Sequence, residues 1–160
     1  MGRLLSSRRI DTNEIISYLE ISPPFLMLDY VNEIEHGRIA QGIKNLSLDD
    51  WFFKCHLGQE MVMPGTLQVE AMLQTLVLLI YTKKDHKGKF AYVTSIRTQL
   101  FHKVVPGNQL VIQAELLSYN RGLSKGIAFG QVDGLKVCSG EFVLVSPHDV
   151  PSPGKVMSQN

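Results

Sequence analysis

Two ionisable side chains, His56 and Glu70, stand fourteen residues apart in a chain of 160 residues. His56 falls in a loop, whereas Glu70 lies inside a segment from Pro64 to about Lys83 that carries almost no charge. A carboxylic acid in an apolar helix is costly to ionise and tends to stay protonated. A neutral imidazole is a natural base near pH 7. Base and acid together suit removal of a proton next to a carbonyl group, followed by loss of a leaving group.

The segment after Pro64 has the pattern of a buried helix, because apolar residues cover most of its circumference. Proline suits the first helical position, where its missing N–H costs nothing. Thr66, Glu70 and Gln74 recur at a four-residue spacing and form one polar stripe. This stripe is either a narrow solvated face or a site in which Thr66 and Gln74 hydrogen-bond the acid. We favour the site, because a solvated face usually carries several charges.

Gly65 lies at the start of the same helix, where backbone N–H groups have no partner within the helix. Such an N–H, at the positive end of the helix dipole, can hold a carbonyl oxygen and stabilise an enolate-like charge. The Pro-Gly pair also serves simply to begin the helix. The two interpretations are compatible.

The remaining histidines and the cysteines offer weaker candidates. A thiol–imidazole couple of Cys55 and His56 is disfavoured, because adjacent residues of an extended segment point apart. Cys55 and Cys138 form no zinc pattern, and a disulfide framework is not expected in a domain of this size. No glycine-rich phosphate loop and no metal-ligand spacing occur. We expect the other histidines to be solvated: His36, His86, His102 and His148.

A mixed α+β fold must position these residues. The pattern predicts a short helix after Asp11, two strands, the long helix and four more strands. An antiparallel six-stranded sheet with one long apolar helix must curl around that helix to cover it. Tight-turn signals at His36-Gly37 and Asp133-Gly134 mark hairpins. The expected strands are 25–34, 38–46, 90–101, 110–116, 127–132 and 137–145.

Composition describes one ordinary globular domain, with 44% hydrophobic and 19% charged residues. A net charge of +1 gives no electrostatic argument for nucleic acid or an anionic membrane. The longest apolar run, Leu76–Tyr81, is too short to span a bilayer, and the basic start lacks the apolar stretch of a secretory signal. We therefore expect a cytoplasmic protein with a flexible tail at 1–10, a folded domain at 11–146 and a disordered tail at 147–160.

From about Asp11 to Val145, the chain resembles the hot-dog-fold 3-hydroxyacyl-[acyl-carrier-protein] dehydratases of bacterial fatty acid synthesis. The spacing from His56 to Glu70 is the family's own, and it is specific when joined to Met63-Pro64-Gly65. The segments that carry the resemblance are Thr12–Ile16, Pro24–Asp29, Val62–Gly65, Glu70–Gln74 and Val104–Leu110.

The resemblance implies a role for each site residue. His56 would take the C2 proton of a 3-hydroxyacyl thioester, and Glu70, directly or through water, would help the C3 hydroxyl depart. The Gly65 N–H would polarise the thioester carbonyl, the Val62 carbonyl would orient the imidazole, and Gln74 would support the acid. The product would be a trans-2-enoyl thioester, without a metal or organic cofactor. The acyl chain would run along the central helix, past Leu67, Ala71 and Leu73.

The resemblance also implies partners. The substrate would be carried by acyl carrier protein. Members of the family pair as homodimers that build each site from both protomers, the histidine from one and the acid from the other. Three such dimers often associate into a homohexamer.

Two segments depart from the family pattern. The usual loop, Gly-His-Phe-Pro-Gly-x-Pro, is here Cys-His-Leu-Gly-Gln-Glu-Met at 55–61, which changes the stiffness of the loop that presents the histidine. The run 51–56 and Gln59-Glu60 are instead similar to dehydratase domains of polyunsaturated fatty acid synthases. Ile21-Ser22-Pro23 replaces the His-Arg-Tyr of many relatives. These departures suggest a dedicated pathway, such as secondary metabolism or an unusual lipid.

Two other functions stay open. A hot-dog thioesterase would use a helix carboxylate to drive hydrolysis, but such hydrolases generally lack a histidine at the position of His56. A catalytically silent acyl-binding or scaffold protein would keep the roll and lose the reaction, which the altered loop after His56 leaves possible. The predicted function is dehydration.

Overall fold

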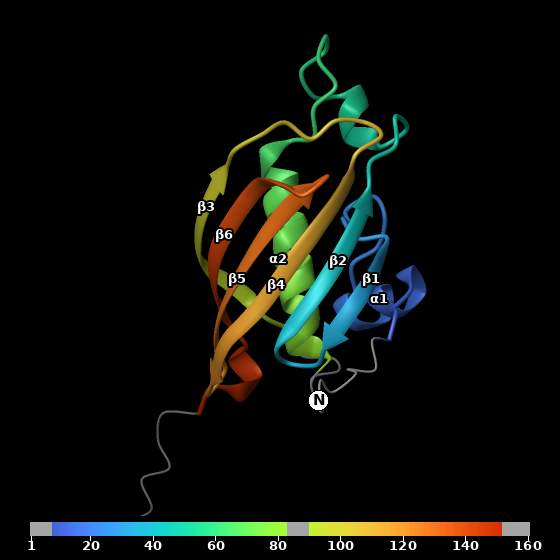
Figure 1. Cartoon of the computed structure of the whole chain (residues 1–160). Coiled ribbons are helices and arrows are strands. Elements are labelled where there is room, and N and C mark those ends of the chain that lie inside the picture. The colour runs from blue at the N-terminus through green and yellow to red at the C-terminus, as the bar shows by residue number, and fades with distance from the viewer. Residues whose placement is uncertain (1–7, 83–89, 152–160) are drawn as a thin grey trace, which may run out of the picture.

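The computed structural model describes residues 8–82 and 90–151, and its sheet curls around one long helix (Figure 1). The described strands form one antiparallel six-stranded sheet in the order β1-β2-β4-β5-β6-β3. The hot-dog prediction is therefore confirmed. The elements are α1 (Thr12–Leu19), β1 (Tyr30–Glu35), β2 (Ile39–Asn45), η1 (Trp51–Lys54), α2 (Gly65–Tyr81), β3 (Tyr92–Leu100), β4 (Gln109–Asn120), β5 (Leu123–Val132), β6 (Leu135–Val145) and η2 (Pro147–Asp149).

The central helix α2 is buried as its apolar surface requires. Leu76, Leu78 and Leu79 are fully covered by the surrounding sheet and loops. Glycine lets the sheet approach the helix closely, because a Cβ at Gly126 of β5 would lie 2.4 Å from Leu76 Cδ1. This tight packing fixes the helix against the sheet, and with it the positions of the residues along the helix.

The first strand is shorter than the sequence pattern predicts. β1 begins at Tyr30, not at Phe25, and the chain turns at Phe25, whose N–H donates to Ser22 O at 3.1 Å. The following Met27 is buried, and its N–H is satisfied by a side chain of α2 instead of a neighbouring strand. A buried backbone N–H needs a hydrogen-bond acceptor. For Met27 this acceptor is the Gln74 side chain, whereas the predicted strand would have used a backbone carbonyl of a neighbouring strand.

The edge strand β3 is poorly covered in the single chain. It pairs with β6 on one side and lies at the end of the sheet. Every residue of β3 is exposed, including Ile96 at 48% and Leu100 at 50%. Both of these side chains belong to the inner face, since they pair with Phe142 and Cys138, which are buried. An apolar inner face without cover at a sheet edge indicates an interaction surface.

Ordered residues lie close to both of the expected domain boundaries, 11 and 146. Ile10 is 1% exposed and its N–H donates to Val31 O at 2.9 Å, so order begins before residue 11. At the other end, Pro147–Asp149 form η2 in place of a disordered start to the tail. The Tyr119 hydroxyl donates to the Asp149 carboxylate and fastens this turn to β4. Residues 1–7 and 152–160 of the expected tails lie outside the described residues.

The predicted hairpin turns are confirmed. Asp133 and Gly134 adopt positive φ angles of 50° and 79°, which join β5 to β6 in a tight turn. Gly37 also has a positive φ, at 74°, between β1 and β2.

Helix α2 begins at Gly65, with Pro64 as its N-cap, and ends at Tyr81.

Candidate active site

The acid of the site is held by Gln74, one turn further along α2. The Gln74 Nε2 group donates to Glu70 Oε1 at 2.9 Å and to Phe25 O at 3.0 Å. Its Oε1 atom accepts from the Met27 N–H at 2.7 Å. Gln74 itself is only 1% exposed, so these hydrogen bonds form away from water. The side chain therefore joins the acid to the loop before β1, at its Phe25 and Met27 backbone groups.

Burial shapes the protonation of Glu70. Desolvation raises the pKa of the Glu70 carboxyl above its ordinary value, and the hydrogen bond from Gln74 lowers it in part. The desolvation effect is the larger of the two, because a half-buried carboxylate loses hydration that one amide does not replace. The protonated form that a proton donor needs is thus favoured.

His56 is half-buried, just after η1, and its ring is oriented from within its own loop. Its Nδ1 lies 2.9 Å from Val62 O. When Nδ1 donates to this carbonyl, Nε2 of the neutral ring carries the free lone pair and can accept a proton. The contact that the family resemblance implies between Val62 and the imidazole is therefore present in the structure.

The start of α2 is overlaid by a side chain of β3. A Cβ built on Gly65 would lie 2.3 Å from Leu100 Cδ1, so Leu100 packs directly over the Gly65 backbone. Helix N-terminal N–H groups and the dipole make this point a ready site for a carbonyl oxygen or an anion. Because Gly65 has no side chain, the apolar Leu100 side chain can lie directly against the backbone at this point.

The structure brings the predicted residues together in two hydrogen-bonded groups, His56 with Val62 and Glu70 with Gln74. Thr66, the third member of the polar stripe, is exposed. Of the residues expected along the acyl chain, Ala71 and Leu73 are buried, and Leu67 packs partly buried against the core. His36, His102 and His148 are exposed as predicted, and His86 lies outside the described residues.

Sequence reasoning missed three contacts of the site, all of them between distant segments. They are the anchoring of Gln74 on the backbone of Phe25 and Met27, the packing of Leu100 on Gly65, and an ion pair between Glu60 and Lys103. The sequence points only to one half of the ion pair, because Glu60 is the single acid in the altered loop. Its basic partner is 43 residues away and nothing in the local pattern selects it.

Other chemistry finds little support in the described residues. Cys138 is buried, which raises the pKa of its thiol to about 11 and leaves it protonated. Residues 8–82 and 90–151 contain no group of three or more histidine, cysteine or acidic side chains that could hold a metal ion. None of the helices in the described part of the chain has the length and hydrophobicity that crossing a lipid bilayer requires.

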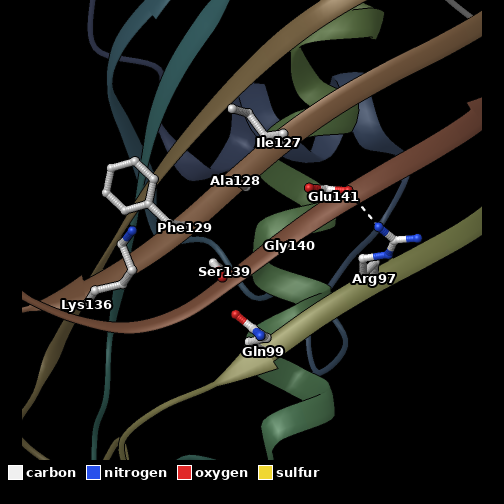
Figure 2. Close-up of a pocket in the computed structure, with 9 residues that line it drawn as sticks. All are labelled: Arg97, Gln99, Ile127, Ala128, Phe129, Lys136, Ser139, Gly140 and Glu141. Atoms are coloured by element: carbon white, nitrogen blue, oxygen red, sulfur yellow. Dashed lines mark ion pairs between the residues drawn. The ribbon is translucent and has the colours of Figure 1, made fainter.

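A hollow of about 380 Å³ lies on the outer face of the sheet, over β3, β5 and β6 (Figure 2). In it, Arg97 faces Glu141 with 3.8 Å between nitrogen and oxygen, and the Lys136 ammonium lies 5.1 Å from the centre of the Phe129 ring. These are ordinary cross-strand and cation–π pairs of a solvated sheet face. None of the predicted site residues lines this hollow, and we assign it no chemistry.

Comparison with known proteins identifies the family. Residues 21–141 match the model of the FabA-like domain, so the chain belongs to this family. It is 43% identical over 130 residues to the 3-hydroxyacyl-[acyl-carrier-protein] dehydratase FabZ of Caldicellulosiruptor bescii, covering 79% of this chain and 93% of the relative. It is 37% identical over 137 residues to the enzyme of the same name from Clostridium botulinum strain Okra, covering 85% and 95% of the two chains.

Solved structures support the same fold. The dehydratase heterocomplex ApeI:P from Xenorhabdus doucetiae contains a chain that matches with a TM-score of 0.70 at 19% identity, covering 83% of this chain and 90% of that one. Cj0977, a sigma28-regulated virulence protein from Campylobacter jejuni, matches with a TM-score of 0.65 at 15% identity and coverages of 91% and 95%.

Proposed function

We propose that this protein is a lyase that dehydrates 3-hydroxyacyl thioesters of acyl carrier protein to trans-2-enoyl thioesters in fatty acid biosynthesis. The observation that carries the proposal is that the chain holds both an oriented imidazole, His56 on Val62 O, and a desolvated carboxyl group, Glu70 on Gln74. Family membership and the named dehydratase relatives support the same reaction.

The reaction uses one base and one acid. His56 Nε2 takes the proton from C2, and the electron pair of the C2–H bond forms the C2=C3 double bond. The C3–O bond breaks as the hydroxyl receives a proton from Glu70, directly or through water, and leaves as water. The Gly65 N–H holds the thioester oxygen and stabilises the enolate-like charge that develops on it. A raised carboxyl pKa fits the donor role.

The neighbouring residues hold these groups in place. The Val62 carbonyl keeps the basic nitrogen of His56 turned toward the substrate, and Gln74 positions the acid. Leu67, Ala71 and Leu73 are the residues of α2 that we place along the acyl chain, with their aliphatic groups excluding water from it. Water exclusion strengthens the electrostatic interactions of the site.

We place each active site between two protomers of a homodimer. The bare inner face of β3, with Ile96 and Leu100 half exposed, supports pairing of β3 with its symmetry mate. A second chain would cover this apolar face and bring its own helix toward it. In this arrangement His56 of one protomer serves the same site as the carboxyl group of Glu70 from the other. Association of three dimers into a hexamer and a cytoplasmic location complete the proposal.

The test uses purified protein and a 3-hydroxyacyl thioester of acyl carrier protein. We expect formation of the enoyl product, followed by its ultraviolet absorbance, and loss of this signal in His56→Ala and Glu70→Gln. His36→Ala and Glu115→Gln, at exposed positions, serve as matched controls and should keep full activity. Release of free thiol would instead identify a thioesterase, and acyl binding with neither product would identify a silent binding protein.

A further inference from the structure

The loop that presents His56 closes on itself through a strained turn. The Glu60 N–H donates to Leu57 O at 2.7 Å. Leu57 adopts a φ of 48°, in the left-handed region that a leucine side chain disfavours. Between His56 and Val62 the sequence contains no proline, so nothing in the covalent chain restricts this loop to its closed form.

Two contacts tie the loop to the segment that follows β3. The Met63 N–H donates to Val104 O at 2.8 Å, which fixes the end of the loop next to α2. The Glu60 carboxylate forms an ion pair with the Lys103 ammonium, which fixes its middle. The second contact is the one that reaches the strained turn itself, since Glu60 is the residue whose N–H closes it.

We propose that the Glu60–Lys103 ion pair is a positioning device that holds the turn closed and so keeps the His56 imidazole on Val62 O. This inference rests on the proposed role of His56 as the base. Opening of the turn would move Val62 relative to His56, because the two ends of that hydrogen bond lie six positions apart in the same loop. The ion pair would replace, by charge, the stiffness that prolines supply in the usual family loop.

The ion pair is exposed, with side-chain exposures of 65% for Lys103 and 53% for Glu60, which limits the size of its effect. Exposed pairs shift an equilibrium by about two- to fivefold, and salt weakens them further. The inference therefore predicts a moderate loss of turnover and a dependence on ionic strength. It does not predict loss of folding.

The test compares Glu60→Gln, Lys103→Met and the charge-reversed Glu60→Lys/Lys103→Glu protein. Each single variant should lower kcat by about two- to fivefold with little change in KM, and the reversed pair should recover most of the loss. Turnover of the wild type should fall as salt rises, while that of the single variants should not. The matched control is Glu35→Gln, which breaks the exposed Arg38–Glu35 ion pair at the β1–β2 turn and should leave kcat unchanged.

A second readout follows the ring itself. Nitrogen NMR of the His56 imidazole should show one dominant tautomer, with Nδ1 protonated, in the wild type and the reversed pair, and averaging in the single variants. Full kcat in both single variants, or no recovery on charge reversal, would overturn the inference. So would an increase in KM for the carrier-protein substrate alone in Lys103→Met, with coenzyme A thioesters unaffected, because that would make Lys103 a carrier contact.

The outcomes also separate this inference from the proposed function. If the wild type makes no enoyl product, the proposed function fails, while the NMR comparison still reports whether the ion pair holds the ring. If the wild type dehydrates its substrate and the variants behave like it in both readouts, the ion pair has no positioning role and the proposed function stands.

Discussion

The side-chain amide of Gln74 donates to Glu70 Oε1 at 2.9 Å while the same side chain is bonded to the backbone of the loop before β1. The acid on the helix is therefore held by a residue that is itself held by another part of the chain. Such support would hold the proposed acid in place without adding a charge beside it.

Replacing Gln74 by leucine should impair both folding stability and turnover. The change leaves the buried Met27 N–H without its acceptor, which costs about 1–3 kcal/mol of unfolding free energy. It also frees the Glu70 carboxyl, and we expect at least about a tenfold decrease in kcat, in line with loss of a supporting hydrogen bond. Chemical denaturation and the enoyl assay measure the two effects. Gln113→Ala on the outer sheet face is the control, and an equal loss there would contradict this assignment.

The raised pKa of Glu70 predicts how activity and stability change with pH. Because the folded state binds the carboxyl proton more tightly than the unfolded state, the folded protein carries more protons at pH values just above the ordinary carboxyl range. The free energy of unfolding then falls as pH rises through the folded pKa of Glu70. The kcat profile should lose activity over the same window as the acid ionises.

The matched measurement uses Glu70→Gln, which cannot titrate at this position. Its stability should depend less on pH than that of the wild type across this window, in denaturation curves recorded at several pH values. A variant with the same pH dependence as the wild type would show that the carboxyl group is not desolvated.

Gly65 and Leu100 should behave as a coupled pair. A methyl group at Gly65 would lie 2.3 Å from Leu100 Cδ1, so Gly65→Ala must displace the leucine or shift the start of α2. A shift of this size at a reacting group costs up to about 10²-fold in turnover. Leu100→Ala removes the collision, so Gly65→Ala/Leu100→Ala should recover part of the activity that Gly65→Ala loses. Strict additivity of the two single effects would exclude direct coupling.

A charge on the inner face of β3 should break the proposed dimer without unfolding the chain. Ile96 is half exposed in the single chain, so Ile96→Lys costs little folding free energy there. Burial against a partner strand would make the same lysine unfavourable, and we expect at least about a tenfold weaker dimer. Sedimentation velocity measures the assembly. Leu135→Lys, exposed at the β5–β6 turn, is the control that should stay dimeric.

Much of the fold could be predicted because its signals are local. The charge-free run after Pro64 identifies the buried helix, and Asp133-Gly134 identifies its hairpin from two residues. The predicted first strand is too long, because the Met27 N–H finds its acceptor on Gln74, 47 residues away, which no periodicity reveals. Similarly, the sequence predicts a strand over β3 but not the exposure of its side chains, because exposure depends on how the strand packs in the folded chain.

The site also has a part that the sequence predicts and a part that it does not. Residue types and spacing single out His56 and Glu70, and the four-residue step to Gln74 predicts its hydrogen bond to the acid. The partners that fix these side chains come from distant segments, as Leu100 does for Gly65. Tertiary packing determines those partners, and no local pattern in a single sequence reveals them.

In the proposed homodimer, His56 of one protomer works with Glu70 of the other, and subunit mixing probes this sharing. His56→Ala and Glu70→Gln dimers, each inactive alone, are unfolded together and refolded as a mixture. Random pairing makes about half of the dimers hybrid, and each hybrid retains one intact site of two, so about a quarter of wild-type activity should return. If the mixture stays inactive although hybrid dimers form, the two residues do not share a site across the dimer.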